Sequence, residues 1–173
     1  MADGTSPDDE LRRLRRGPRP GEKPAGMGTV RFLARCQGDA ETVLLRVKDV
    51  LEVVLSETHT GKISESLKSL LPRWFLDASS GELSREAAET HLKWLKTLPR
   101  EEQIRAEKEA KWSLSNWLYW FQPSERYWYW WDASVEDSNT LRIAVEVVDW
   151  PFPWGSLEWL FRAAGAIEMK AEP

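Results

Sequence analysis

Tryptophan and arginine are the side chains in this sequence whose types and spacing are best suited to chemistry. Eleven of the 173 residues are tryptophan, and nine of these lie between residues 112 and 159. Indole rings and guanidinium groups stack on planar or cationic groups, anchor peptides and hold anions. The tryptophan-rich composition therefore indicates a binding surface.

Residues with the reactivity needed for catalysis are few and scattered. The chain has two histidines, His59 and His91, and one cysteine, Cys36. We expect His59 at an exposed helix end, His91 on the apolar side of a helix, and Cys36 at a buried strand position. The glycines are isolated, so no phosphate-cradling loop is predicted. The sequence predicts no catalytic residue, no metal site and no cofactor, and it leaves open an active site assembled from scattered residues.

The charge balance and hydropathy of the chain restrict its partners and its compartment. Lys and Arg number 24 and Asp and Glu number 28, so the net charge is −4. A dedicated binder of duplex nucleic acid is usually basic, which argues against that class. No run reaches the ~18 apolar residues of a membrane span, and no apolar segment follows the first residues. We therefore expect a cytoplasmic protein that does not enter a membrane.

Four segments have the patterns of β-strands. Residues 29–36 and 141–148 alternate apolar and polar side chains, as half-buried strands do. The aromatic segment 126–132 favours a strand that pairs with 141–148 as a hairpin, and 166–170 favours a short edge strand. The sheet face that meets the helices is expected to carry Val30, Phe32, Ala34, Ile143, Val145, Val147, Ile167 and Met169.

Two helices complete the predicted core. One amphipathic helix is expected over about residues 40–57, and another follows Trp154 and ends at Gly165. The order strand, helix, strand, strand, helix, strand predicts an α+β domain with a ferredoxin-like antiparallel sheet, spanning 28–173. A large helical insertion, at about 60–122, separates the first helix from the second strand. The alternative is a C-terminal hairpin that packs on a separate helical bundle.

The insertion is predicted to consist of several amphipathic helices. Helical spacing of apolar residues indicates segments at about 63–77, from Ser84 onward, at 99–111 and at 114–121. Ser84 is a suitable N-cap for the second of these. Its inner side is expected to carry Ala87, Ala88, His91, Leu92 and Leu95.

Residues 1–27 are predicted to form a flexible tail. Proline and glycine are frequent there, and no apolar periodicity appears. A mobile, solvated leader is the favoured interpretation, because chain ends are usually mobile. The other interpretation is a basic arm for an anionic partner, since six basic side chains lie in this segment.

The aromatic strand has large rings on both of its faces. Alternation places Tyr127, Tyr129 and Trp131 on one side and Trp128, Trp130 and Asp132 on the other. The proline-rich segment after the next strand limits backbone freedom and presents further rings at low entropic cost. The predicted binding residues are Arg31, Arg35, Trp128, Trp130, Arg142, Trp150, Phe152 and Trp154.

These observations favour a non-catalytic cytoplasmic binding module that recognises a protein or peptide, such as an accessory or immunity-type protein. The rings of the aromatic strand are alternatively a second core beneath the inserted helices. A small ferredoxin-like enzyme that binds an aromatic or planar ligand stays open, with an enclosed pocket as its distinguishing feature. Single-stranded nucleic acid or a nucleotide is a further alternative, disfavoured by the acidic charge. The sequence makes no prediction of oligomeric state.

Overall fold

A four-stranded antiparallel sheet is the framework of the chain in residues 5–58 and 66–173, which the computed structural model describes. The strand order is β2-β3-β1-β4, and each neighbouring pair is antiparallel. The strands are β1 (Gly28–Cys36), β2 (Trp128–Asp137), β3 (Thr140–Val147) and β4 (Ala166–Ala171). The architecture is therefore α+β, with β2 and β4 at the two edges of the sheet.

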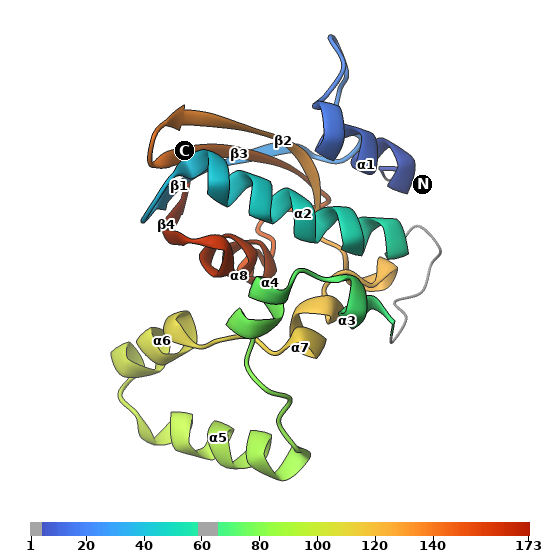
Figure 1. Ribbon diagram of the computed structural model, residues 1–173. Coiled ribbons are helices and arrows are strands. Elements are labelled where there is room, and N and C mark those ends of the chain that lie inside the picture. Colours follow the sequence, from blue (N-terminus) through green and yellow to red (C-terminus); the bar gives the residue numbers. More distant parts are fainter. Residues whose placement is uncertain (1–4, 59–65) are drawn as a thin grey trace.

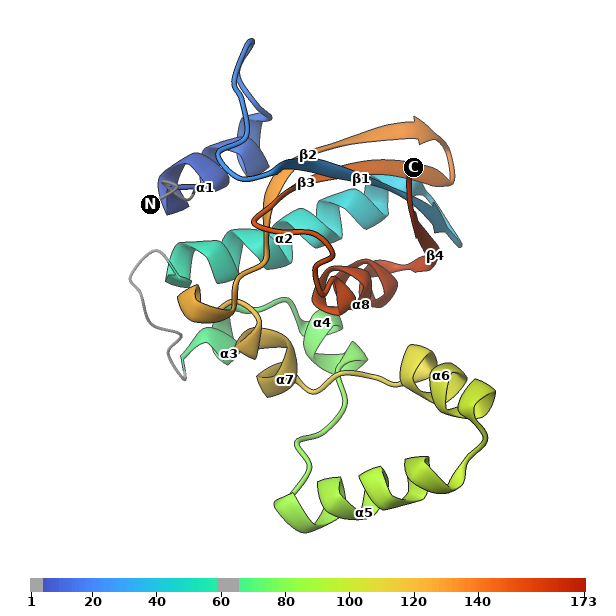
Figure 2. The same ribbon diagram turned by 180° about the vertical axis from the view of Figure 1, so that it is seen from behind.

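Two helices cover one face of this sheet (Figures 1 and 2). They are α2 (Ala40–Thr58) and α8 (Gly155–Ala164), and they contact each other. Valines and leucines recur along α2 at helical spacing and are buried, because they form the stripe that meets the sheet. Gly165 ends α8 with φ +126°, the conformation that glycine adopts without strain.

The buried face of the sheet carries most of the residues predicted for it. Seven of the eight belong to the core or pack against it: Val30, Phe32, Ala34, Ile143, Val145, Val147 and Met169. The prediction for Ile167 was wrong, since 51% of this residue is exposed. A bulge pairs Cys36 with Ala166 and Arg35 with Glu168, so Ile167 falls outside the regular alternation.

The helical insertion is confirmed between α2 and β2, although its expected start near residue 60 and His59 lie outside the described residues. The expected helix at 63–77 is interrupted, because Pro72 disfavours helical backbone at Leu71, which is extended. The inserted elements are α3 (Leu67–Leu70), α4 (Arg73–Ala78), α5 (Arg85–Thr97), α6 (Arg100–Glu109), α7 (Leu114–Tyr119) and the 3₁₀ turn η1 (Pro123–Glu125).

Helices α5 and α6 project from the body of the molecule, and we call them the α5–α6 arm (Figures 1 and 2). The N-cap prediction is confirmed, since Ser84 Oγ accepts a hydrogen bond from the backbone N–H of Ala87. The predicted inner side of α5 is not buried in the core, so this part of the prediction was wrong. None of the residues of α5 or α6 is buried, and Leu92 is exposed.

Residues 7–16 form a docked helix, α1 (Pro7–Arg16), where the sequence predicts part of a flexible tail. Ser6 caps its N-terminus through the N–H of Asp9, and α1 contacts α2 and β2. Only Leu11 and Leu14 anchor it by apolar burial. The remaining anchors are charged side chains, which a search for apolar periodicity does not detect.

Candidate functional site

The face of the sheet opposite α2 and α8 carries the arginines that the sequence assigns to a binding surface. Arg31 pairs with Ala144 and Leu33 with Arg142 across β1 and β3, so these side chains share one face. Arg31, Arg35 and Arg142 are exposed there. The end of this outer face near Glu146 is covered, because Thr5 donates a hydrogen bond to the buried Glu146 carboxylate.

A hollow of 280 Å³ lies on the outer face where β1, β2 and β3 run side by side. A bulge in β2 creates one wall, because Trp130 pairs with Val145 and Asp132 with Ala144, which leaves Trp131 as the extra residue. A bulge of this kind re-aims a side chain. The hollow is lined by Thr29, Arg31, Trp131, Asp132, Ala133, Ser134, Arg142 and Ala144. We call it the outer-face hollow.

The two arginines of the outer-face hollow differ in their electrostatic surroundings. Arg142 forms ion pairs with Glu136 at 3.1 Å and with Glu172 at 3.2 Å. Arg31 forms no ion pair with any residue that the structure describes. Among the described residues, therefore, Arg31 has no ion-pair partner to lose before its guanidinium binds a carboxylate or another anion.

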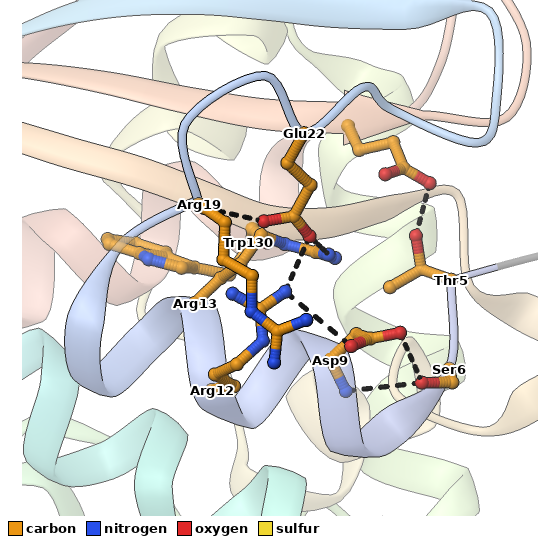
Figure 3. A network of polar contacts seen from close by, with 9 residues as sticks. Thr5, Ser6, Asp9, Arg12, Arg13, Arg19, Glu22 and Trp130 are labelled. Atoms are coloured by element: carbon orange, nitrogen blue, oxygen red, sulfur yellow. Dashed lines mark hydrogen bonds and ion pairs between the residues drawn. The ribbon is translucent and has the colours of Figure 1, made fainter.

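The indole of Trp131 is held in place from its α1 side. The Arg13 guanidinium carbon lies 4.8 Å from the centroid of the Trp131 ring, a cation–π arrangement. Arg13 Nη1 also donates to Glu22 Oε1 at 3.0 Å, and Arg12 Nη2 donates to the same oxygen at 2.5 Å (Figure 3). These bonds, with that of Arg12 as the largest contribution, lower the pKa of Glu22 to about 2. The network holds the Arg13 guanidinium in place beside Trp131.

The same helix also covers the backbone of the edge strand β2 at Trp130. Glu10 Oε1 accepts the backbone N–H of Trp130 at 2.8 Å and a bond from Arg126 Nη2 at 2.6 Å. Arg13 Nε donates to the carbonyl oxygen of Trp130 at 3.2 Å. The two side chains thus satisfy both backbone groups of Trp130, as a neighbouring strand would. A carboxylate and a guanidinium therefore close this edge of the sheet at Trp130.

Trp128 and Trp130 do not lie on the outer face, so this part of the predicted surface was wrong. Both rings are buried on the helix side, opposite Val147 and Val145. Trp128 Nε1 donates to Ser156 Oγ at 3.0 Å, and Trp130 stacks on Phe161. Because both faces of the segment 127–131 carry large rings, alternation separates two sets but does not say which set faces the core. The second-core alternative also differs from the structure, because both rings belong to the main core.

The segment 150–154 presents less aromatic surface than the sequence predicts. Trp150 is 55% exposed, but Phe152 is buried and Trp154 is half-buried. The Trp154 ring lies 4.9 Å from the ring of Phe32, so both predicted anchors serve the core. Arg35 is exposed and pairs with Glu168 at 3.4 Å, outside the outer-face hollow.

Sequence reasoning missed four polar or aromatic residues of the outer-face hollow. They are Thr29, Trp131, Asp132 and Ser134. The signal for Trp131 was present, since alternation sets it apart from Trp128 and Trp130. The bulge also brings Asp132 to the same hollow, which simple alternation does not foresee.

A second hollow, of 460 Å³, lies between the α5–α6 arm and α7. Its aromatic lining comes from Trp112, Tyr119 and Trp120, and His91 reaches it from α5. The His91 ring lies 5.6 Å from that of Trp94 on the same helix. This hollow is larger than the outer-face hollow, but it contains none of the three predicted binding arginines.

The described residues offer little for metal or nucleophilic chemistry. No group of three His, Cys, Asp or Glu side chains among them is placed to hold a metal ion. Burial raises the pKa of the Cys36 thiol, which disfavours the reactive thiolate. Among these same residues, no helix is long and apolar enough to cross a bilayer.

Comparison with known proteins adds no relative from which a function can be transferred. No protein-family model, no curated protein and no solved structure matches the chain.

Proposed function

We propose that the protein is a non-catalytic binding module that recognises a protein or peptide on the outer face of its sheet. The observation that carries this proposal is the outer-face hollow, where the guanidinium of Arg31, without an ion pair among the described residues, lies in the same depression as the indole of Trp131. Arginine and tryptophan are the side chains most often found as anchors in protein interfaces. An accessory or immunity-type role fits a module of this kind.

The chemistry of the hollow indicates what the partner carries. Arg31 favours a carboxylate, because a guanidinium and a carboxylate form two parallel hydrogen bonds. The Trp131 ring favours a flat or apolar side chain next to that carboxylate. We therefore propose that the partner presents an acidic residue beside an aromatic or aliphatic one.

We also propose that the sheet with α2 and α8 has the ferredoxin-like arrangement. The strand order β2-β3-β1-β4 and the antiparallel pairing of all neighbours support it. This arrangement places both helices on one face, and it leaves the opposite face for a partner. The cytoplasmic location expected from the sequence stays a prediction.

An enzyme that holds a planar ligand between sheet and helices has less support. Aromatic rings fill that space, since Trp130 stacks on Phe161 and Trp128 lies 5.6 Å from Phe121. A strand of nucleic acid also has less support, because the chain carries a net charge of −4.

Selection from a random peptide library on the full chain tests the proposal. We expect enriched peptides to share an acidic residue beside an apolar one, and Arg31→Ser to weaken their binding by about tenfold or more. Arg85→Ser is the matched control, because the Arg85 side chain is 92% exposed on the α5–α6 arm. It should bind the peptides as the unchanged chain does.

Two outcomes contradict this proposal. The first is a selection without any enriched sequence, or with peptides that bind Arg31→Ser and the unchanged chain equally. The second is binding of a single-stranded oligonucleotide, titrated as a separate probe, that depends on Trp131 and Arg31. Circular dichroism of each variant establishes that the fold is intact.

A further inference from the structure

The two edge strands of the sheet differ in whether other parts of the chain bond to their outer backbone groups. At β2, Glu10 and Arg13 occupy the backbone groups of Trp130. At β4, β1 pairs with one side, and no strand in the described ranges pairs with the other. Figures 1 and 2 show no helix alongside that outer side of β4. An uncovered strand edge is a template for pairing with another chain.

The register with β1 identifies which backbone groups of β4 face outward. The N–H of Glu172 donates to the carbonyl of Arg31 at 2.8 Å. Alternate residues of an antiparallel strand bond to the same neighbour, so Lys170 and Glu168 also point their backbone groups toward β1. The N–H and C=O of Met169, between them, point to the open side.

We propose that β4 pairs with β4 of a second copy of this chain, antiparallel and centred on Met169. The two Met169 residues then exchange their N–H···O=C bonds across a two-fold axis. Glu168 of each copy lies opposite Lys170 of the other, in the closely spaced pairing that brings side chains together. One sheet continues through both copies.

Charge selects this register over its neighbours. A shift of the pairing by two residues in one direction sets Glu168 opposite Glu168. The same shift in the other direction sets Lys170 opposite Lys170. Like charges directly opposite each other destabilise strand pairs. After a shift by one residue, outward-pointing backbone groups of one copy lie opposite groups of the other that already bond to β1. The side chains of the two strands then also lie on mismatched faces.

The surroundings of Glu168 fit the same arrangement. Its carboxylate lies 3.0 Å from the Lys170 ammonium and 3.4 Å from the Arg35 guanidinium of its own chain. In the pair of copies, Arg35, Glu168 and the other copy's Lys170 form a row of alternating charges along the outer face. The exposed Ile167, at the β4 bulge, adds apolar surface at the seam. A lysine on an edge strand disfavours pairing with an unrelated strand. In contrast, Glu168 and Lys170, two residues apart, have complementary charges when two copies of β4 pair antiparallel.

Sedimentation of the full chain and of two charge variants tests this self-association. We expect the unchanged chain to form dimers as its concentration rises toward about 1 mM, since a short strand pairing is weak. Lys170→Glu sets Glu opposite Glu, and Glu168→Lys sets Lys opposite Lys. Each variant should raise the dissociation constant about tenfold or more. An equimolar mixture restores opposite charges at both positions and should restore the dimer as a heterodimer.

The control and the failures are equally specific. Lys108→Glu, on α6, changes the net charge as Lys170→Glu does and should leave the dimer unchanged. A chain that stays monomeric at about 1 mM overturns the proposal, and so does a dimer that neither variant weakens. A mixture that stays monomeric overturns the register centred on Met169. Circular dichroism excludes misfolding, because both substituted side chains are substantially exposed.

Discussion

The indole of Trp130 lies parallel to the ring of Phe161, with 6.4 Å between the ring centroids, and only 1% of the residue is exposed. Its backbone N–H and C=O are bonded to Glu10 and Arg13 of α1. One residue therefore joins three parts of the molecule: the sheet, α8 and α1. Tryptophan often anchors protein interfaces, but the side chain of Trp130 stabilises the fold instead.

Replacement of Trp130 by alanine separates a packing role from a binding role. We expect Trp130→Ala to lower the free energy of unfolding by about 3–5 kcal/mol, because the lost ring leaves a cavity. Urea unfolding measures this change. Trp150→Ala is the control, since Trp150 is largely exposed and its loss should cost about 1 kcal/mol or less. An unfolding midpoint for Trp130→Ala equal to that of Trp150→Ala would contradict the burial of this ring.

At the scale of elements, α1 is joined to the sheet mainly through charged side chains. Glu22 follows α1 in the chain and accepts bonds from Arg12 and Arg13, and Arg13 in turn contacts β2. Ion pairs and hydrogen bonds depend on protonation, whereas apolar contacts do not. The docking of α1 should therefore respond to pH.

The pKa of Glu22 sets the direction of that response. It lies at about 2 in the folded chain, below its ordinary value of 4.5, chiefly because Arg12 bonds the carboxylate. The folded state gains stability from Glu22 above pH 4.5 and loses it as pH falls toward 2.

Glu22→Gln tests this dependence by unfolding in urea at neutral pH and at about pH 3. The variant should be less stable than the unchanged chain at neutral pH, and the difference should shrink in acid. Glu101→Gln, on the exposed α6 helix, should show no such convergence. A difference for Glu22→Gln that is the same at both pH values would rule out the proposed role of the carboxylate.

At the scale of the whole molecule, the α5–α6 arm is structurally separate from the body. None of the residues of α5 and α6 is buried. The two ends of the arm lie together, since the N–H of Ser80 donates to the carbonyl of Trp112 at 2.9 Å. If the arm is removed, a short linker can therefore join the two chain ends without a change in the backbone of the body.

Excision of the arm should leave the body folded. Replacement of residues 83–109 by a short Gly-Ser linker removes little buried surface, so we expect the melting temperature to change by no more than about 2 °C. Calorimetry measures it. Trp117→Ala, in the buried part of α7, is the comparison and should lower the melting temperature clearly. A comparable fall after excision would mean that the arm belongs to the cooperative unit.

The sequence by itself determined the features that depend on local periodicity. Alternation in 29–36 and 141–148 predicted two strands and their buried side chains, and helical spacing predicted α2. Gly165 and Ser84 marked helix boundaries by their own chemistry. These predictions succeeded because each rests on contacts that a short stretch of chain makes with a generic apolar interior.

Only the tertiary structure decided which face each aromatic ring occupies and which charged groups are satisfied. Trp130 packs in the core while Trp131 lines the outer-face hollow, and buried Glu10 and Arg13 dock α1. Arg31 keeps no ion pair among the described residues, while Arg142 has two. Each of these facts depends on a partner distant in sequence, and register, bulges and ion pairs leave no periodic signal in the chain that forms them.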